Sequence, residues 1–443
     1  MVNGSTTGGS SAGLEPRRLS AEDLSILALE DETVAGHTCK VIVLDGPIDL
    51  ERLRASIRSR LDRVPELSER LSQIDGEPCW VPDSRVDLRA HVVGCERVEP
   101  ANDTGLATTA ARIFERRLDR SRPLWRINVV SELDGGRSAL IWRIHHALAD
   151  GATAMRMVRG ALWDEERVAD VREATSGQRP AAPKHVTAAA RHRFGALRAA
   201  AREVPQPWMR SPFDGHIDAH REVAFATVEL ERLRRMAKAT DGATVNDVVL
   251  AVIAGGLRRW LEAHHGHLGA VRVKVPVSLH EPAVAPARGV ATPGNRDSFF
   301  CLDLPLEGND PLARLDAIRS ATRVRKQEHD AEHLDALMRR LGRAPGLRRF
   351  AERVLAHPRS FALNVSNVPG PRKTVRVLGL RVDALYSLAE IRRHHALRIA
   401  VVSLADTLNF GLVADPTLLP DVDALASAIQ LEAGALSARL TPV

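Results

Sequence analysis

The residues His145-His146-Ala147-Leu148-Ala149-Asp150-Gly151 stand between two segments of different periodicity. Residues 139–144 form a short apolar run that is typical of a buried strand, whereas the apolar residues of 152–163 recur at helical spacing. A turn after a buried strand holds its side chains rigidly at a sheet edge, where they can face a cleft. We therefore expect a functional site at this turn.

The residue types in the turn suit proton transfer. A neutral imidazole has the ordinary pKa that allows it to take a proton from an alcohol near neutral pH. Asp150 follows His146 by four residues and can fix the turn through an ion pair or hydrogen bonds, and Gly151 lets another backbone approach closely. A histidine pair alone would fit a satisfied core or surface position equally well, so the aspartate and the glycine make the pattern more specific.

Two further histidine pairs act as internal controls, because neither is followed by Asp-Gly at the matching distance. His264 and His265 belong to a polar segment after an apolar helix, which predicts a solvated helix end rather than a zinc site. His394 and His395 follow two arginines, which predicts a charged surface loop.

The composition is that of an ordinary globular protein. The chain has 443 residues, of which 44% are hydrophobic and 27% charged, and this length allows two or three domains. The apolar runs are shorter than the roughly 18 residues that a membrane-spanning helix needs, so we expect no such helix. The four cysteines are too widely spaced for a metal knuckle and too few for a disulfide scaffold, which fits a reducing cytoplasm.

Strand and helix signals alternate along the chain, which predicts a mixed α/β fold (α+β mixed sheets). Helices are expected at 21–29, 50–61, 152–163, from 245, and at 421–440, and strands at 40–44, 126–130, 138–144, 223–225, 271–277, 298–304, 374–382, 397–404 and 408–413. Residues 1–16 are rich in Gly, Ser and Thr and are expected to be a disordered leader.

A change in composition predicts the domain boundary. The segment 166–215 is charged and rich in Ala, Arg and Pro, so we interpret it as a crossover that contains a basic amphipathic helix. Residues 17–165 would then form an N-terminal domain that carries the histidine motif, and residues 216–443 a C-terminal domain.

The heptapeptide matches the His-His-x-x-x-Asp-Gly motif of the CoA-dependent acyltransferase superfamily, which includes chloramphenicol acetyltransferase and condensation domains. Four other stretches of the chain indicate one branch of this superfamily. They are Pro123-Leu124-Trp125, Asn246-Asp247, Gly294-Asn295-Arg296 and Asn367-Val368-Pro369-Gly370-Pro371. In this order, over about residues 19–415, the chain resembles the bacterial wax ester synthase/acyl-CoA:diacylglycerol acyltransferase family. Arg126 and the segment 20–37 depart from the pattern of that family.

The resemblance implies two chloramphenicol acetyltransferase-like domains with a tunnel between them. It makes His146 the general base that deprotonates an acceptor hydroxyl for direct attack on a thioester, without an acyl-enzyme. His145 would shape the site, Asp150 would hold the loop together with an arginine, and Gly151 would clear space for a neighbouring backbone.

The reaction also needs donors for a tetrahedral oxyanion, and the family match makes Asn246 a candidate. Thr244 and Asp247 have the spacing of a capping box, so Asn246 and Asp247 could instead belong to an ordinary helix start. The residues assigned to substrate binding are Pro123, Leu124, Trp125, Asp247, Asn295, Arg296, Ser366 and Asn367. Packing is the alternative for Pro123 to Trp125, and a rigid turn is the alternative for residues 367–371.

The expected partners are long-chain acyl-CoA and either diacylglycerol or a fatty alcohol, with no metal or further cofactor. The alternative is a superfamily acyltransferase that uses another alcohol or an amine, or a carrier-protein thioester as donor. A nucleic-acid partner is not expected, because the net charge of +6 is spread along the chain and only 4% of the residues are aromatic.

Two basic stretches, residues 191–202 and 337–355, interleave arginines with leucines and alanines. Basic amphipathic helices lie on anionic membrane surfaces, so we expect a cytoplasmic protein that is peripheral to the inner face of the plasma membrane or to lipid droplets. The alternative is that these stretches are solvated helix faces that pack across the crossover.

Overall fold

A computed structural model describes residues 16–95, 98–164, 202, 211–266, 268, 271–278, 297–328, 330–341, 351, 354, 357 and 359–440. It contains two six-stranded sheets and one small three-stranded sheet. The predicted leader, most of the predicted crossover, and Asn295 and Arg296 lie outside the described residues.

The first sheet holds the histidine motif. Its order is β12-β13-β2-β7-β6-β5. The strands are β2 (His37–Leu44), β5 (Val92–Gly94), β6 (Trp125–Leu133), β7 (Arg137–His145), β12 (Arg376–Val377) and β13 (Leu380–Ala389). The pairing of β5 with β6 is parallel and the other pairings are antiparallel, so the sheet is mixed.

The second sheet has the order β10-β9-β11-β14-β15-β8. Its strands are β8 (Glu222–Glu229), β9 (Val271–Ser278), β10 (Asp297–Leu304), β11 (Leu363–Val368), β14 (Leu397–Leu404) and β15 (Thr407–Ala414). Only β11 runs parallel to its neighbours β9 and β14, so this sheet is mixed as well. The small sheet joins β1 (Arg17–Arg18), β4 (Glu77–Pro82) and β3 (Glu69–Ile74).

Polar side chains cap the starts of several helices. Ser20 and Thr244 each form a capping box with the aspartate three residues later, and Asp49 accepts the N–H of Arg52. The helices are α1 (Ala21–Leu27), α2 (Leu50–Arg58), α3 (Leu88–His91), α4 (Asp103–Phe114), α5 (Gly151–Ala161), α7 (Leu230–Ala239), α8 (Val245–His265), α9 (Pro311–Gln327), α10 (Asp330–Leu341) and α12 (Val422–Leu440). Short 3-10 turns lie at Leu61–Arg63, Pro65–Ser68 and Asp134–Gly136.

The single strand expected at 374–382 is wrong. The chain forms the two-residue strand β12, turns at Leu378 and Gly379, and then continues as β13 to Ala389. Both turn residues have positive φ, 54° and 87°, which an extended strand does not allow. The apolar pattern of residues 374–382 does not reveal this turn.

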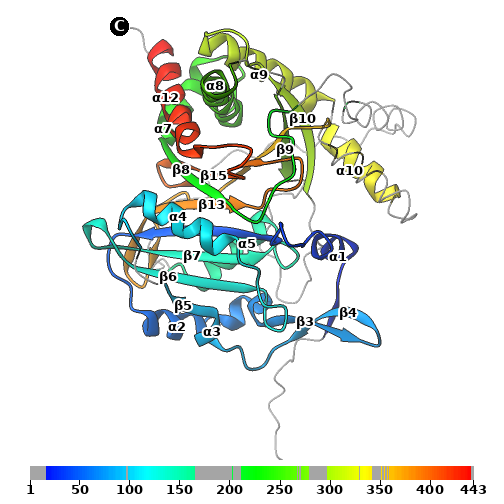
Figure 1. Cartoon of the computed structure of the whole chain (residues 1–443), viewed down its shortest axis with the longest axis vertical. Coiled ribbons are helices and arrows are strands. Elements are labelled where there is room, and N and C mark those ends of the chain that lie inside the picture. The colour runs from blue at the N-terminus through cyan, green and yellow to red at the C-terminus, as the bar shows by residue number, and fades with distance from the viewer. Residues whose placement is uncertain are drawn as a thin grey trace, which may run out of the picture.

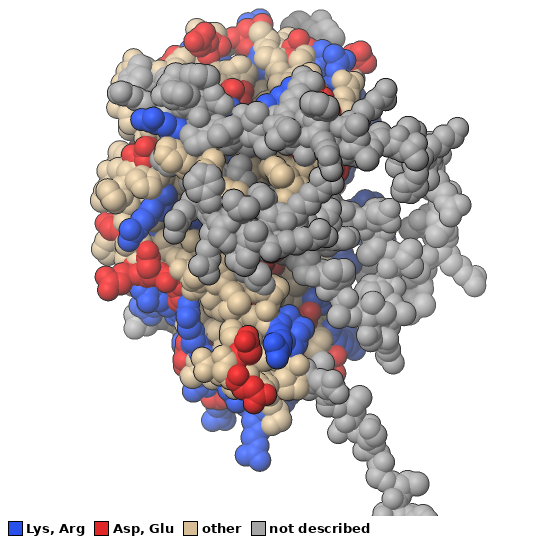
Figure 2. All heavy atoms as spheres, turned by 90° about the vertical axis from the view of Figure 1, so that its right-hand side faces the viewer, with Lys and Arg blue, Asp and Glu red and all other residues tan. Residues whose placement is uncertain are grey.

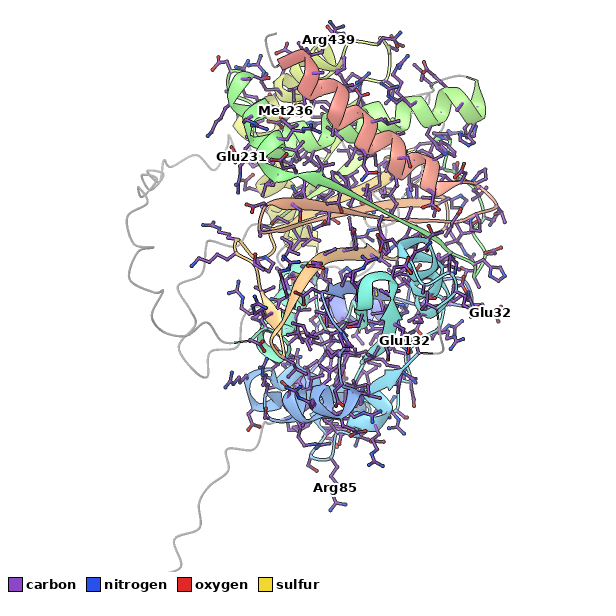
Figure 3. All side chains as sticks on the ribbon, turned by 90° about the vertical axis from the view of Figure 1, so that its left-hand side faces the viewer. Glu32, Arg85, Glu132, Glu231, Met236 and Arg439 are labelled. Carbon is purple, nitrogen blue, oxygen red and sulfur yellow. The ribbon has the colours of Figure 1, made fainter. Side chains whose placement is uncertain are left out.

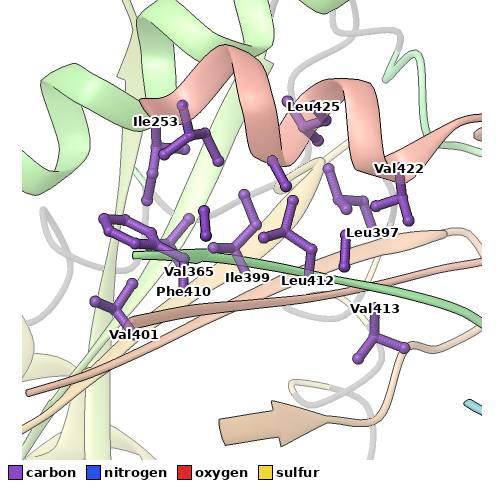
Figure 4. Close-up of a cluster of buried hydrophobic side chains, with 14 of the residues drawn as sticks. Ile253, Val365, Leu397, Ile399, Val401, Phe410, Leu412, Val413, Val422 and Leu425 are labelled. Carbon is purple, nitrogen blue, oxygen red and sulfur yellow. The ribbon is translucent and has the colours of Figure 1, made fainter. Parts of the chain in front are cut away.

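The elements are stacked in layers (Figure 1). Helices α7, α8, α9 and α12 cover one side of the second sheet, and its other side faces the first sheet. The core under α8 and α12 consists of alternate residues of β11, β14 and β15 such as Val365, Ile399 and Leu412 (Figure 4). A second core joins α2 and α5 to the far face of the first sheet. Figure 3 shows Arg85 and Arg439 at opposite ends of this stack.

The second half of the chain contributes two strands, β12 and β13, to the first sheet. The strand β13 pairs with β2 although about 340 residues separate them, so the second half completes the sheet of the predicted N-terminal domain. The two sheets touch closely at Gly411 of β15, because a Cβ there would lie 2.2 Å from the carbonyl oxygen of Ser387 in β13. The two sheets therefore pack directly against each other at this position.

A buried ion pair fastens the halves beside the histidine motif. The Nε of Arg221, which precedes β8, lies 3.0 Å from the Oε1 of Glu390, which follows β13. The second carboxylate oxygen of Glu390 accepts the N–H of Ala35 at 3.1 Å, and the Arg221 guanidinium also donates to the carbonyl of Thr33. The loop before β2 is thus held by residues from the second half.

Breaking this pair is expected to destabilise the fold. Arg221→Ala leaves the Glu390 carboxylate buried without its cation, which costs about 3–5 kcal/mol of unfolding free energy. Urea denaturation followed by circular dichroism measures this loss. The matched control is Arg85→Ala at an exposed position, which should change the free energy by less than about 0.5 kcal/mol. Equal stability of Arg221→Ala and the wild type would contradict the role of the pair.

Candidate active site

The histidine motif is positioned by backbone hydrogen bonds from two other segments. The strand β7 ends at His145, whose N–H donates to the carbonyl of Leu124 at 2.9 Å. The N–H of His146 donates to the carbonyl of Gly36 at 2.9 Å. The N–H groups of Leu148 and Ala149 then return to the carbonyl of His145, which closes a tight turn. The backbone at both histidines is therefore fixed.

Asp150 ends the turn and begins the next helix. Its carboxylate accepts the N–H of Thr153 at 2.6 Å, so Asp150 is the N-cap of α5. Since a capping carboxylate is occupied with backbone, its role is to hold the loop, as expected.

The charge of Asp150 acts on the buried Lys40. Within the described chain, no arginine forms an ion pair with Asp150, whereas the charge of the buried Lys40 acts on it. Burial lowers the pKa of Lys40 to about 8, and Asp150 partly opposes this shift. The Nζ of Lys40 donates to the Oγ of Ser387 at 2.6 Å. An arginine partner, which the resemblance implies, is thus absent from the described contacts of Asp150.

Gly151 lies against a turn of the second half. A Cβ on Gly151 would be 3.2 Å from Cγ2 of Val368, which is tighter than most side-chain contacts. The absence of a side chain at Gly151 lets the end of β11 approach the start of α5. The space at Gly151 is occupied by the side chain of Val368, whereas the expectation was a neighbouring backbone.

His145 is oriented by its surroundings on both ring nitrogens. Its Nδ1 accepts the N–H of Ala147 at 3.1 Å, which assigns the ring proton to Nε2. That Nε2 lies 3.5 Å from the carboxylate of Glu30 and against Gly36, where a Cβ would come within 2.8 Å. Gly36 has a φ of 69°, so glycine is favoured there for both reasons. His145 is thus a fixed residue of the site wall.

Glu30 is the partner that keeps His145 in place. Its side chain is 3% exposed and receives the Nε of Arg120 at 2.9 Å. Burial by itself raises the pKa of Glu30, but hydrogen bonds from His145 and Arg120 and the charge of Arg120 outweigh it, so the pKa lies below its ordinary value. Glu30 therefore carries a negative charge at neutral pH and attracts the Nε2–H of His145.

His146 is a neutral base in a positive environment. It is half-buried, and its pKa is lowered from 6.5 to about 4. Burial is the largest cause, and the positive charge of Arg398 is the next. The weak opposing effect of Asp150 does not restore the ordinary value. At neutral pH the ring consequently keeps a free lone pair that can accept a proton.

Arg398 lies on β14, on the face that does not belong to the helix-covered core. Its neighbours Leu397 and Ile399 point into that core, so alternation directs Arg398 toward the first half. Its guanidinium donates to the carbonyl of Glu390 at 3.1 Å, and burial lowers its pKa to about 10, so it is charged at neutral pH. The same alternation places Ser366 of β11 on this face, because the preceding residue, Val365, belongs to the core. Asn367 follows Ser366 in the strand.

The structure brings Asn246 and Asn367 together. The Nδ2 of Asn367 donates to the Oδ1 of Asn246 over 3.4 Å. This hydrogen bond fixes the orientation of the Asn246 side-chain amide. The Nδ2 of Asn246 has no protein acceptor among the described residues, so it is available as a donor.

Asp247 is a structural residue. One carboxylate oxygen accepts the N–H and the hydroxyl of Thr244, and the other accepts the hydroxyl of Thr322 at 2.6 Å. It is 2% exposed. The assignment of Asp247 to substrate binding is therefore replaced by the capping alternative, because both oxygens are taken up by the protein.

Pro123, Leu124 and Trp125 are buried, and the last two are at most 1% exposed. The indole N–H of Trp125 donates to the carbonyl of Leu67 at 2.8 Å, and its ring stacks on His91. The geometry fits the packing alternative for this segment. Its contribution to the site is the carbonyl of Leu124, which holds His145.

The control histidines differ from the motif as expected, with one exception. His264 is exposed at the end of α8, and its Nδ1 contacts the carbonyl of Trp260 at 2.9 Å. His394 pairs with Asp214 at 2.8 Å. The prediction of a surface loop is wrong for His395, which is 5% exposed and stacks on Phe361 with ring centroids 4.0 Å apart.

Three residues of the site were not singled out in the sequence, namely Glu30, Lys40 and Arg398. A lysine inside the otherwise apolar strand β2, and an arginine inside the apolar strand β14, are signals that could have been used. Glu30 stands in a polar connection after α1 and gives no such signal.

The arrangement is suited to moving a proton from a hydroxyl group. His146 supplies an uncharged base on a rigid turn, and the positive charge of Arg398 in the same environment favours negative charge that develops on a reacting oxygen. No group of three or more His, Cys, Asp or Glu side chains that could hold a metal ion occurs within the described ranges.

Comparison with known sequences gives matches over most of the chain. Residues 19–204 and 171–249 match the wax ester synthase/diacylglycerol acyltransferase catalytic domain, and residues 293–436 match the WS/DGAT C-terminal domain. A Mycobacterium tuberculosis relative named "Putative diacyglycerol O-acyltransferase Rv1760" is 30% identical, with 91% of this chain and 87% of the relative covered. A Mycobacterium bovis relative with the same description, Mb0919, is 32% identical, with 81% and 78% covered.

Solved structures show the same fold. The wax ester synthase/diacylglycerol acyltransferase from Marinobacter aquaeolei VT8 aligns with a TM-score of 0.71 at 20% identity, covering 96% of this chain and 99% of that one. The first condensation domain of the CDA synthetase aligns with a TM-score of 0.59 at 17% identity, covering 97% and 98%. Together with the sequence matches, these comparisons show that the chain belongs to the wax ester synthase/diacylglycerol acyltransferase family.

Proposed function

We propose that this protein is an O-acyltransferase that transfers a long-chain acyl group from acyl-CoA to diacylglycerol, to a fatty alcohol, or to both. The observation that carries the proposal is the neutral, half-buried His146 on its fixed turn, in a chain of this family. The names of the curated relatives support diacylglycerol as an acceptor.

In the proposed reaction, His146 takes the proton of the acceptor hydroxyl while its oxygen attacks the thioester carbonyl. The new carbon–oxygen bond gives a tetrahedral intermediate with a negative oxygen. This intermediate collapses by breaking the carbon–sulfur bond, and the proton passes from His146 to the leaving CoA thiolate. The ester and free CoA are released, and no covalent acyl-enzyme is required.

The other residues of the site act through position and charge. His145 and Glu30 hold the wall beside the base, and Asp150 holds the turn. The amide of Asn246, fixed by Asn367, is the proposed donor to the oxyanion, and Arg398 supplies positive charge. Asn295 and Arg296 remain candidate substrate contacts from the family pattern, as do Ser366 and Asn367.

We further propose contact with a membrane or lipid-droplet surface, because the acceptors and products partition there. No helix in the described parts of the chain is long and apolar enough to span a bilayer. On the face shown in Figure 2, acidic and basic side chains intermingle. The proposal rests on the basic stretches 191–202 and 337–355, whose side chains lie largely outside the described residues.

Replacing His146 tests its role as the base. His146→Ala should lower acceptor-dependent release of free CoA from palmitoyl-CoA by about a hundredfold or more, which is the scale of a lost general base. The assay uses diacylglycerol and hexadecanol in parallel, so that the better acceptor distinguishes triacylglycerol from wax ester synthesis. Unchanged activity of a folded His146→Ala variant would contradict the assignment. Activity with an acyl carrier protein thioester in place of palmitoyl-CoA would favour the alternative donor.

The lowered pKa of His146 determines the pH dependence of the reaction. Because protonation removes the base, kcat/KM should stay level as the pH falls through 6.5 and should decrease only near the pKa of about 4. Arg398→Gln should move this acid limb to higher pH, since a positive charge that opposes protonation is lost. Arg393→Gln, whose side chain is exposed and pairs with Asp31, should leave the limb in place. A wild-type acid limb near 6.5 would contradict the buried environment of the base.

Vesicle binding tests the proposed contact with a membrane surface. The protein should co-sediment with anionic phospholipid vesicles at low salt and not with zwitterionic ones, because basic helices bind anionic surfaces. Replacing Arg339, Arg340 and Arg343 by glutamine should weaken binding. No sedimentation with anionic vesicles at low salt would refute peripheral attachment.

A further inference from the structure

The surroundings of His146 hold more positive than negative charge. The charges of Arg398 and Arg392 both act on the imidazole, and each lowers its pKa. The two guanidinium groups also lie close enough to repel each other, because the charge of Arg392 lowers the pKa of Arg398. Two cations therefore act together on the region beside the base.

The carboxylates near these cations are bound to other groups. The charge of Glu390 acts on both arginines, but one of its oxygens lies 3.0 Å from the Nε of Arg221 and the other accepts the N–H of Ala35. Three further carboxylates of the motif and of the loop before β2 are also occupied, namely Glu30 by Arg120, Asp31 by Arg393, and Asp150 as the cap of α5. Glu32 of the same loop is exposed to solvent. The positive charge of Arg392 and Arg398 is therefore not balanced by an ion pair of their own.

Both arginines keep hydrogen-bonding capacity that the protein does not use. The guanidinium of Arg398 donates to the carbonyl of Glu390 at 3.1 Å, whereas its buried Nε has no hydrogen-bond partner among the described residues. Arg392 is exposed, and its side chain forms no ion pair or hydrogen bond within the described part of the chain. A buried N–H group without an acceptor costs free energy, and a guanidinium group matches the geometry of carboxylate and phosphate groups. The two arginines are thus complementary to an anion.

A continuous series of contacts links these arginines to the base. Glu390, whose carbonyl accepts from Arg398, also accepts the N–H of Ala35 with its side chain. The residue after Ala35 is Gly36, whose carbonyl accepts the N–H of His146 at 2.9 Å. Alternation along β14 directs Arg398 toward this same region of the first half. An anion bound by Arg398 therefore lies on the side of His146 that the second half of the chain forms.

The reaction proposed above uses only part of this positive charge. The tetrahedral intermediate carries one negative charge on its oxygen, and neutral acceptors such as diacylglycerol and hexadecanol bring none. We propose that Arg392 and Arg398 bind a carboxylate or phosphate group of the acceptor, so that the protein also acylates hydroxyl lipids that are anionic. The hydroxyl oxygen still forms the new ester bond, the carbon–sulfur bond of the thioester breaks, and the anionic group stays unmodified. This inference rests on the acyl transfer proposed above.

The test compares acceptors that differ only in charge. With palmitoyl-CoA as donor, kcat/KM for 3-hydroxydodecanoate should exceed that for its methyl ester by about tenfold or more, which is the scale of one charge-assisted hydrogen bond. The lipids 1-palmitoylglycerol 3-phosphate and 1-palmitoylglycerol form the corresponding phosphate pair, so the larger ratio identifies the preferred anion. Equal values within both pairs would overturn the inference.

A substitution locates the anion site. Arg392→Gln should lower the ratio of kcat/KM between the charged and the neutral acceptor by about tenfold, because one of the two cations is lost. The matched control is Arg393→Gln, which removes the neighbouring arginine that pairs with Asp31 and should leave the ratio in place. An equal decrease of the ratio in both variants would overturn the assignment, since it would reflect a general attraction of anions to this surface.

Direct binding separates this inference from the proposed reaction. Isothermal titration in the absence of acyl-CoA should show about tenfold weaker binding of the preferred anion to Arg392→Gln than to the wild type. The titration uses both 3-hydroxydodecanoate and 1-palmitoylglycerol 3-phosphate, and equal binding of each by the two proteins would overturn the anion site. If the wild type acylates no acceptor of either kind, the proposed function is refuted, while the titration still decides the anion site.

Discussion

The hydrogen bond from the N–H of His146 to the carbonyl of Gly36 is the contact on which the site depends. It ties the end of β7 to the loop before β2, and the left-handed backbone of Gly36 makes the approach possible. The same glycine leaves room for the ring of His145. A histidine at a strand end is common, but here the backbone on both sides is fixed before any substrate binds. Such preorganisation is what a proton-transfer site requires.

That loop is itself held by the other half of the chain. Glu390 accepts the N–H of Ala35 and is paired with Arg221, and β13 completes the sheet that carries the histidines. Arg398 donates to the carbonyl of Glu390 and also lowers the pKa of His146. The second half of the chain therefore positions the loop before β2 and also keeps His146 uncharged. Both effects act at the interface between the two halves. Neither half would form this environment alone.

The sequence predicted the parts of the fold that local pattern controls. Helix starts at Ser20, Asp49 and Thr244 follow from capping chemistry, and the strands around the histidine motif follow from apolar runs. The pairing of β13 with β2 could not be predicted, since no local pattern encodes a partner about 340 residues away.

The site shows the same division. The motif identified His146, Asp150 and Gly151, whereas Glu30, Lys40 and Arg398 are brought to the site by tertiary packing. Asp247 belongs to a family motif and was assigned to substrate binding, but in the structure it takes part in the capping box of α8. The segment 20–37, which departs from the family pattern, nevertheless supplies both Glu30 and Gly36.

The central claim is that His146 is an uncharged base throughout the neutral range. An NMR titration of the imidazole C–H signals tests it most directly, with the resonance of His146 identified by its loss in His146→Gln. The account predicts a signal that titrates with a pKa of about 4. A midpoint at the ordinary value of 6.5 would contradict it, because the ring would then be neither desolvated nor under the influence of Arg398.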